Sequence, residues 1–202
     1  MTHLYIKTDK IRPAIVDLVA GSLKAGQVLV LPTDTIYGLS CLATDLRAIK
    51  KIYRIKKRDP RKPVLVLVSD LAMAKKYVYI SKKQEAFLED YWSKRSEPTT
   101  VIFKNKGRLP EALTKNSSGL ALRLPKSKFL IKIIEKAGCP LVSTSLNFSG
   151  QADITNLKKL TKYFPQKSDR PDLVIDTGPA PRRKPSRVID LRLPGQAIII
   201  RP

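Results

Sequence analysis

Short apolar runs alternate with amphipathic helical segments along all 202 residues, and this alternation limits the possible folds more than any other feature. Residues 27–32 (QVLVLP) and 62–70 (KPVLVLVSD) are apolar runs of strand length. Residues 11–24 and 126–138 carry apolar side chains at helical spacing. A continuously apolar strand needs cover on both faces, and the intervening helices supply it. The sequence therefore predicts a single layered α/β domain over residues 1–202.

Later segments continue the alternation. Residues 99–104, 119–124 and 140–144 have strand character, and residues 155–163 are predicted to form a helix. Residues 178–186 are rich in Pro, Arg and Lys, which is typical of a mobile loop on the surface. Polar residues that directly follow the strands fall where open sheets tend to bind ligands.

The charge balance is strongly basic, with 39 Lys and Arg against 17 Asp and Glu and a formal net charge of +22. Such an excess indicates a polyanionic partner, and solvated lysine faces are the plain alternative. Aromatic residues make up 6% of the chain and are not interleaved with basic residues. We therefore expect contact with the backbone of tRNA or double-stranded RNA rather than stacking on single strands.

Histidine and cysteine usage excludes several kinds of site. The one histidine, His3, lies near a terminus that we expect to be mobile, which argues against a Ser-His-Asp triad, a Cys-His dyad and a His-rich metal site. Cys41 and Cys139 are far apart in sequence, as expected for reduced thiols in a cytoplasmic protein. No apolar run approaches the roughly 18 residues that span a membrane, so no membrane partner is expected.

Two polar clusters follow predicted strands. Residues 31–39 place Thr33, Asp34 and Thr35 directly after an apolar run, and residues 143–150 hold three Ser, one Thr and one Asn. Turn formation explains such residues equally well, because Ser, Asp, Asn and Gly all favour turns. A ligand site at the strand ends is the alternative.

Cations are dense in residues 50–63, with eight basic residues and one acid. Lys56 and Arg58 fall at the end of a predicted helix, where they either complement the helix dipole or grip phosphate. Arg123 ends an apolar strand and either reaches solvent or pairs with a ligand carboxylate. The sequence contains neither a P-loop nor a G-x-G-x-x-G motif, so any phosphate must be held by Lys, Arg and hydroxyl groups.

Together these stretches resemble the YrdC-like family, the threonylcarbamoyl-AMP synthases of tRNA modification. The matching motifs run in family order over nearly the whole chain: PTDTIYGL at 32–39, Lys56-x-Arg58 followed by KPVLVLV, PTT at 98–100, GLALRLP at 119–125, STSLNFSG at 143–150, DTG at 176–178, PSRVIDL at 185–191 and the terminal IIIRP.

The resemblance implies a three-layer fold, with a twisted mixed seven-stranded sheet flanked by helices. It also implies a reaction in which L-threonine, bicarbonate and ATP give threonylcarbamoyl-AMP and pyrophosphate. Mg-ATP is the expected substrate form, with Mg²⁺ bound by few protein ligands. A partner complex would then transfer the threonylcarbamoyl group to an adenosine at position 37 of tRNA.

The resemblance also assigns residues. Lys56 and Arg58 take the catalytic positions. The threonine-binding positions are Thr35, Arg123, Ser145 and Ser186. The ATP-binding positions are Lys56, Arg58, Lys62, Ser143, Asn147, Thr155 and Arg201.

Four residues depart from the family pattern. Asp59 stands where Pro is usual, Glu97 replaces Gly, Leu146 replaces Ala and Arg187 replaces Thr. A YciO-like paralogue that acts mainly as a double-stranded RNA or tRNA-binding protein is therefore the alternative. A sugar-phosphate enzyme of related fold is a weaker alternative. Such enzymes use acidic metal ligands and a His, and this chain offers no usable His.

Overall fold

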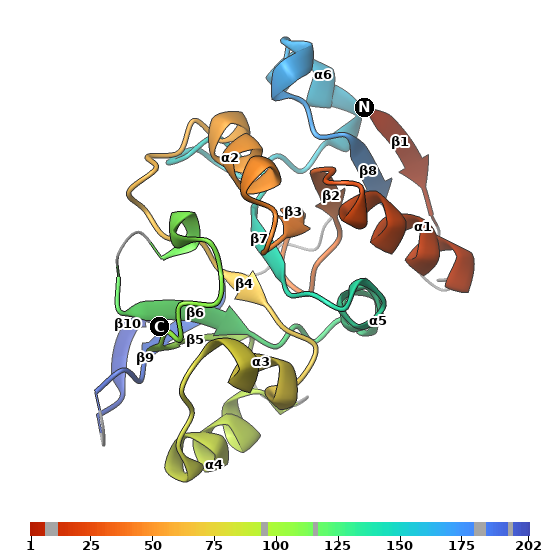
Figure 1. The fold of residues 1–202 in the computed structure, drawn as a ribbon. Coiled ribbons are helices and arrows are strands. Elements are labelled where there is room, and N and C mark those ends of the chain that lie inside the picture. The colour runs from red at the N-terminus through yellow and green to blue at the C-terminus, as the bar shows by residue number, and fades with distance from the viewer. Residues whose placement is uncertain (7–11, 94–96, 115–116, 180–184, 194–195) are drawn as a thin grey trace.

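The computed structural model describes residues 1–6, 12–93, 97–114, 117–179, 185–193 and 196–202 (Figure 1). Part of the predicted loop, residues 180–184, lies outside this described set. The α-helices are α1 (Pro13–Lys24), α2 (Leu46–Ile55), α3 (Leu71–Tyr77), α4 (Lys82–Tyr91), α5 (Lys128–Ala137) and α6 (Leu160–Tyr163). The strands are β1 (Thr2–Tyr5), β2 (Leu29–Leu31), β3 (Gly38–Leu42), β4 (Val66–Leu67), β5 (Thr99–Lys104), β6 (Gly119–Arg123), β7 (Leu141–Ser145), β8 (Leu173–Asp176), β9 (Arg187–Asp190) and β10 (Ile198–Arg201).

The strands form one mixed sheet in the order β1-β8-β2-β3-β7-β4-β6-β5-β9-β10. Its β1/β8, β8/β2, β4/β6 and β5/β9 pairs are parallel, and the remaining pairs are antiparallel. The mixed sheet is as predicted, but the count of seven strands is wrong, because the sheet has ten. Short segments at both edges, β1 and β10, extend it, since pairing satisfies their backbone N–H and C=O groups.

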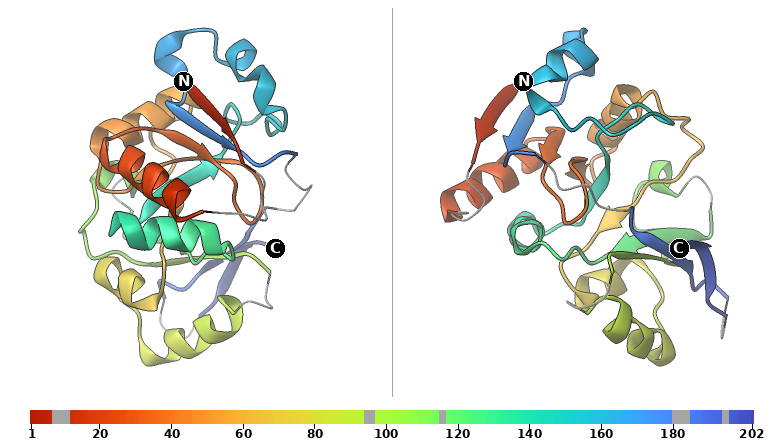
Figure 2. Two further views of the ribbon diagram at one scale, coloured as in Figure 1. Left: turned by 90° about the vertical axis from the view of Figure 1, so that its right-hand side faces the viewer. Right: turned by 180° about the vertical axis from the view of Figure 1, so that it is seen from behind.

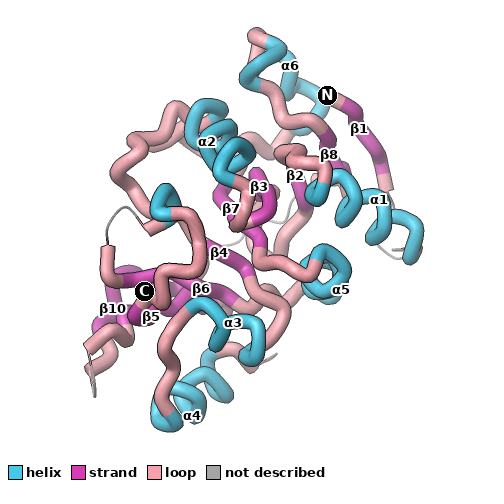
Figure 3. Tube along the Cα trace, in the orientation of Figure 1, coloured by secondary structure: helices cyan, strands magenta, loops and turns pink. Residues whose placement is uncertain are grey.

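Helices cover both faces of the twisted sheet, as Figures 2 and 3 show. Alternate strand residues enter two separate cores: in β2, Leu29 and Leu31 pack with α1 and α5, whereas Val30 packs on the face that α2 covers. In β7, Leu141 and Val142 divide in the same way. Strands buried on both faces explain the unbroken apolar runs of the sequence, and the predicted three layers are confirmed.

Local sequence signals set the helix ends. The side chain of Asp45 caps α2 by accepting hydrogen bonds from Arg47 N at 2.9 Å and Ala48 N at 3.0 Å. Gly138 ends α5 with a φ of 69°, a left-handed conformation that glycine adopts without strain. The helix predicted over 155–163 is shorter, a 3₁₀ turn followed by α6. None of the helices within the described ranges is long and apolar enough to cross a membrane.

The N-terminal segment differs from the mobile terminus that we expected. β1 pairs with β8, and Nε2 of His3 lies 2.8 Å from Oδ2 of Asp176. This contact crosses from one end of the chain to the other, which sequence spacing cannot reveal.

Candidate active site

A cavity of about 490 Å³ opens where β3, β6, β7, β9 and β10 come together. Eight of the eleven predicted site residues line it: Thr35, Arg58, Arg123, Ser143, Ser145, Asn147, Ser186 and Arg201. These residues come from six separated parts of the sequence. The structure therefore brings together most of the residues that the sequence analysis singled out.

Hydrogen bonds to the hydroxyl group of Thr33 fix the conformation of the loop after β2. Oγ1 of Thr33 accepts hydrogen bonds from Thr35 N at 3.0 Å and Ile36 N at 3.2 Å, and it donates to Ile36 O at 2.6 Å. The loop then enters β3 at Gly38, where an added Cβ would lie 2.7 Å from Oγ of Ser143. Glycine thus lets the backbone approach β7 closely, and Thr33 holds Thr35 at the cavity wall.

Tyr37 joins this loop to the C-terminal part of the cavity. Its hydroxyl donates to Gly178 O at 2.7 Å and accepts from Thr177 N at 2.8 Å. Hydrogen bonds therefore join two motifs that lie about 140 residues apart, PTDTIYGL and DTG.

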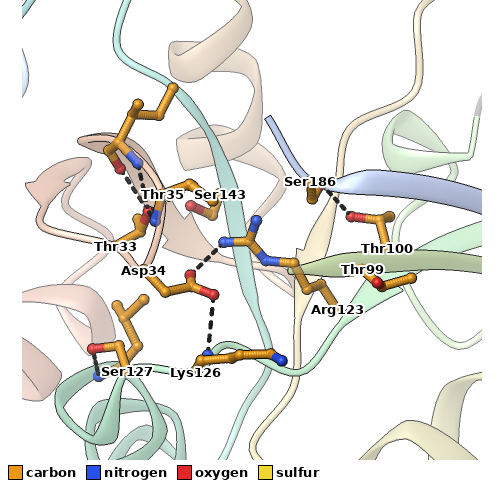
Figure 4. A network of polar contacts seen from close by, with 12 residues as sticks. Thr33, Asp34, Thr35, Thr99, Thr100, Arg123, Lys126, Ser127, Ser143 and Ser186 are labelled. Carbon is orange, nitrogen blue, oxygen red and sulfur yellow. Dashed lines mark hydrogen bonds and ion pairs between the residues drawn. The ribbon is translucent and has the colours of Figure 1, made fainter. Parts of the chain in front are cut away.

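Arg123 is the most deeply buried cation that faces the cavity, with 4% of its surface exposed. Its Nη2 lies 2.7 Å from Oδ1 of Asp34, whose Oδ2 accepts from Lys126 N at 3.1 Å (Figure 4). Nε of Arg123 has no hydrogen-bond partner among the described residues. Burial lowers the pKa of Arg123, Asp34 opposes that effect, and the nearby charge of Arg201 adds to it. A buried guanidinium with an unpaired donor suits a ligand carboxylate.

Ser186 lies across the cavity from this pair and is held from two sides. Its Oγ is 2.8 Å from Oγ1 of Thr100, and both residues are buried (Figure 4). The guanidinium of Arg201 donates from Nε at 2.9 Å and Nη2 at 2.7 Å to Ser186 O. Thr100 and Arg201 thus position both the hydroxyl and the backbone of Ser186.

Lys56 is buried, with 1% of its surface exposed, and it lies behind the cavity wall rather than in it. Its Nζ donates to the carbonyl oxygens of Ser145 and Asn147 and to Oδ1 of Asn147. Burial, with the charge of Arg58 beside it, lowers the pKa of Lys56 to about 8. The geometry therefore makes Lys56 the anchor of residues 145–147.

Some cations of the basic stretch 50–63 form ion pairs that support the fold, and Arg58 lines the cavity. Lys51 pairs with Asp172 at 2.6 Å, and Arg54 pairs with Asp169 at 3.2 Å, so these cations secure α2 to the C-terminal part of the chain. Neither of them lines the cavity.

Arg58 does line the cavity, where its Nη2 donates to Pro63 O at 2.8 Å. Lys62 and Thr155 do not line it, and both are exposed. Lys62 contributes a backbone carbonyl that accepts from the Tyr53 hydroxyl at 2.7 Å. The ATP-binding roles of Lys62 and Thr155 therefore stay predictions.

Comparison with known proteins gives matches that cover most of the chain. The family model Sua5_yciO_yrdC, described as "Telomere recombination", matches residues 21–202. The chain belongs to this family. Threonylcarbamoyl-AMP synthase of Mus musculus is 33% identical over 201 residues, which are 96% of this chain and 67% of the mouse protein. Threonylcarbamoyl-AMP synthase of Stutzerimonas stutzeri is 30% identical over 187 residues, which are 93% of this chain and 96% of that protein.

A solved structure of the family has the same fold. The crystal structure of P. abyssi Sua5 complexed with L-threonine superposes with a TM-score of 0.85 at 22% identity. The match covers 100% of this chain and 57% of that one, so this chain spans little more than half of the P. abyssi protein.

The departures from the Sua5/YciO/YrdC pattern have structural explanations outside the cavity. Glu97 and Arg187 contact each other, with Oε2 and Nη2 3.2 Å apart. Asp59 accepts from the backbone N of Arg61 at 2.8 Å and from its guanidinium at 3.0 Å. Leu146 is 0% exposed in the core. None of these four substituted positions lines the cavity.

Sequence reasoning missed the supporting residues of this family site. Asp34 was recognised only as part of a polar cluster, and its bond to Arg123 joins residues 89 positions apart. The motif at 98–100 gives no role to Thr100, which bonds to Ser186, and no motif points to Asp153, which lines the cavity. A lone acid next to a hydroxyl-rich loop was the available signal for Asp34, but spacing does not show which cation it meets.

Within the described ranges, no three His, Cys, Asp or Glu residues cluster in a way that would hold a metal ion. Asp153 supplies one carboxylate at the cavity wall. That donor set fits Mg²⁺ only as a companion of ATP, because Mg²⁺ usually binds through one or two carboxylates, water and substrate phosphates.

Proposed function

We propose that this chain is an L-threonylcarbamoyladenylate synthase, a nucleotidyltransferase that serves threonylcarbamoyladenosine formation at position 37 of tRNA. The observation that carries the proposal is the cavity itself, in which Arg123, buried and paired with Asp34, lies among hydroxyl groups and further cations. The names of the mouse and S. stutzeri relatives support the same activity.

The proposed reaction has two bond-forming steps. The amino nitrogen of threonine bonds to the carbon of bicarbonate, with loss of water and a proton, and gives a carbamate. A carbamate oxygen then bonds to the α-phosphorus of ATP while the bond to the pyrophosphate oxygen breaks. Positioning and charge neutralisation are the main demands of this chemistry, so no nucleophilic side chain is required.

The threonine end of the cavity is proposed to lie between Arg123 and Ser186. The guanidinium of Arg123 lines the cavity and suits the threonine carboxylate, and Asp34 keeps the guanidinium in place. The hydroxyl groups of Thr35, Ser145 and Ser186 offer hydrogen bonds to the remaining polar groups of the amino acid.

The nucleotide end is proposed to lie along Arg58 and Arg201, whose charges would offset the charge that develops on the phosphates. Ser143 and Asn147 add hydrogen-bonding groups on the same wall. Mg²⁺ would accompany ATP and supply further charge neutralisation at the phosphates. Lys56 would act through residues 145–147 that it anchors, which revises its expected direct role in catalysis.

A pyrophosphate assay tests the proposal. Purified protein with ATP, bicarbonate and L-threonine should release pyrophosphate and form threonylcarbamoyl-AMP, detected by mass spectrometry. Omission of threonine should abolish both signals, and so should Arg58→Ala. No threonine-dependent release from protein that circular dichroism shows to be folded would reject the synthase.

An RNA-binding protein without this activity, as in the YciO-like branch, is the second candidate, and the net charge of +22 favours it. Arg58→Ala separates the two functions: catalysis should collapse, whereas RNA binding should weaken only slightly. A cytoplasmic location and a partner complex for threonylcarbamoyl transfer belong to the first proposal, with tRNA as the final acceptor.

A further inference from the structure

The segment between α3 and α4 pairs with the chain that follows β5 (Figure 1). Val78 and Asn105 form an antiparallel bridge. Tyr79 N donates to Lys104 O, and Lys106 N donates to Tyr77 O, both at 2.9 Å. Val78 is 0% exposed and anchors this short ribbon in the core. The ribbon is thus a firm support for the side chains that it presents outward.

One of those side chains is an exposed aromatic ring beside two cations. Tyr79 is 55% exposed. The Nζ atoms of Lys104 and Lys106 lie 5.9 Å and 5.1 Å from its ring centroid. Nζ of Lys106 is held in place by Lys75 O at 2.6 Å. Aromatic and basic residues that are not interleaved in the sequence are therefore neighbours in the fold.

This combination has a specific chemical use. The two ammonium groups lie over the ring. An exposed ring offers a stacking face for an unpaired base, and the flexible lysine side chains can turn from the ring to meet the phosphates that flank that base. The bases of a duplex are already stacked, so a duplex would use the lysines and not the ring. None of these three residues lines the cavity, so the site of the proposed reaction does not account for them.

We propose that Tyr79, Lys104 and Lys106 form a docking surface for unpaired bases in a single-stranded RNA loop. The sequence favoured contact with the RNA backbone alone, whereas this surface would add stacking of a base on the Tyr79 ring. The proposal is independent of the synthase reaction, because a catalytically silent chain would still carry this ribbon. The strongly basic balance of the whole chain favours approach of the polyanion.

Fluorescence anisotropy with a labelled hairpin RNA that has an unpaired loop tests the surface. The control ligand is a blunt duplex with the sequence of the same stem. Tyr79→Leu should weaken hairpin binding about tenfold, because stacking of a base on an aromatic side chain is lost. Tyr79→Phe keeps the ring and should bind the hairpin like the parent protein, and duplex binding should be equal for all three proteins.

The lysines are tested by salt dependence. Lys104→Gln and Lys106→Gln should each reduce the slope of log affinity against log salt by roughly 0.7 for the hairpin. Lys128→Gln, at an exposed position on α5, is a matched control, and it should leave the slope unchanged.

Three results would overturn the proposal: parent protein that binds no hairpin, Tyr79→Leu protein that binds it normally, or equal losses on hairpin and duplex. Tyr79-dependent binding to phosphatidylserine vesicles in place of RNA would also overturn it and would assign the surface to membranes. Threonine-dependent pyrophosphate release by Tyr79→Leu, measured in parallel, should match the parent. That assay separates failure of this surface from failure of the proposed synthase.

Discussion

Two buried cations lie at the candidate active site, and the protein treats them in opposite ways. Arg123 pairs with a carboxylate, Asp34, and lines the cavity. Lys56 does not line the cavity, and the hydrogen bonds of its Nζ within the described ranges go to neutral oxygen atoms of residues 145–147. Arg123 is therefore placed to meet a ligand in the cavity, whereas the hydrogen bonds of Lys56 hold a loop of the protein.

Removal of the carboxylate beside Arg123 should have the largest effect. Asp34→Asn leaves a buried guanidinium without its counter-charge and should lower the free energy of unfolding by about 3–5 kcal/mol. Urea denaturation measures this loss. Asp153→Asn, at an exposed position of the same cavity, is the control and should stay within about 0.5 kcal/mol. A loss below about 1 kcal/mol for Asp34→Asn would mean that the pair does not support the fold.

Removal of the ammonium from Lys56 should have a smaller effect on stability. Lys56→Met removes the ammonium that donates to Ser145 O, Asn147 O and Asn147 Oδ1, and it should cost about 1–3 kcal/mol. It should also raise the KM for threonine, because Ser145 is no longer held in place. The neighbouring Lys57→Met is the matched control, since Lys57 is exposed and its Nζ only lies over the Phe148 ring. Equal KM values for the two variants would contradict the anchoring role of Lys56.

The titration of Lys56 sharpens the contrast. Its pKa in the folded protein is about 8, against an ordinary value of 10.5, so the folded state loses a proton first as pH rises. Between these two values the unfolded state binds more protons, and the free energy of unfolding should rise with pH by at most about 3 kcal/mol. Urea denaturation of the parent and of Lys56→Met between these pH values measures the difference. A difference that is constant across this range would contradict the lowered pKa.

The smallest effect is expected at Thr100. Thr100→Val removes the hydroxyl that meets Ser186 at 2.8 Å, and it should cost about 1 kcal/mol in stability. The KM for threonine should rise while Thr100→Ser restores it. Thr99→Val is the control at the next position, because the Thr99 hydroxyl donates to Glu97 O at 2.9 Å and not to a cavity residue. An unchanged KM for Thr100→Val would show that Ser186 does not depend on this bond.

Most of the fold follows from local patterns. Continuous apolar runs such as 27–32 predicted strands buried on both faces, and the two cores on opposite sides of β2 confirm that reading. The number of strands did not follow, because β1 and β10 lie at the sheet edges and are stabilised by pairing rather than by an apolar pattern. His3 shows the same limit, since its partner Asp176 lies at the other end of the chain.

Motifs and their order along the chain predicted most of the groups that line the cavity, among them Thr35, Arg58, Arg123 and Ser186. Only the tertiary structure decided what each group does there. Asp34 meets Arg123, Thr100 meets Ser186, and Lys56 turns away from the cavity toward residues 145–147. The physical reason is that a charge or a hydroxyl acquires its role from its neighbours and its burial, and strand pairing brings these neighbours from distant parts of the chain.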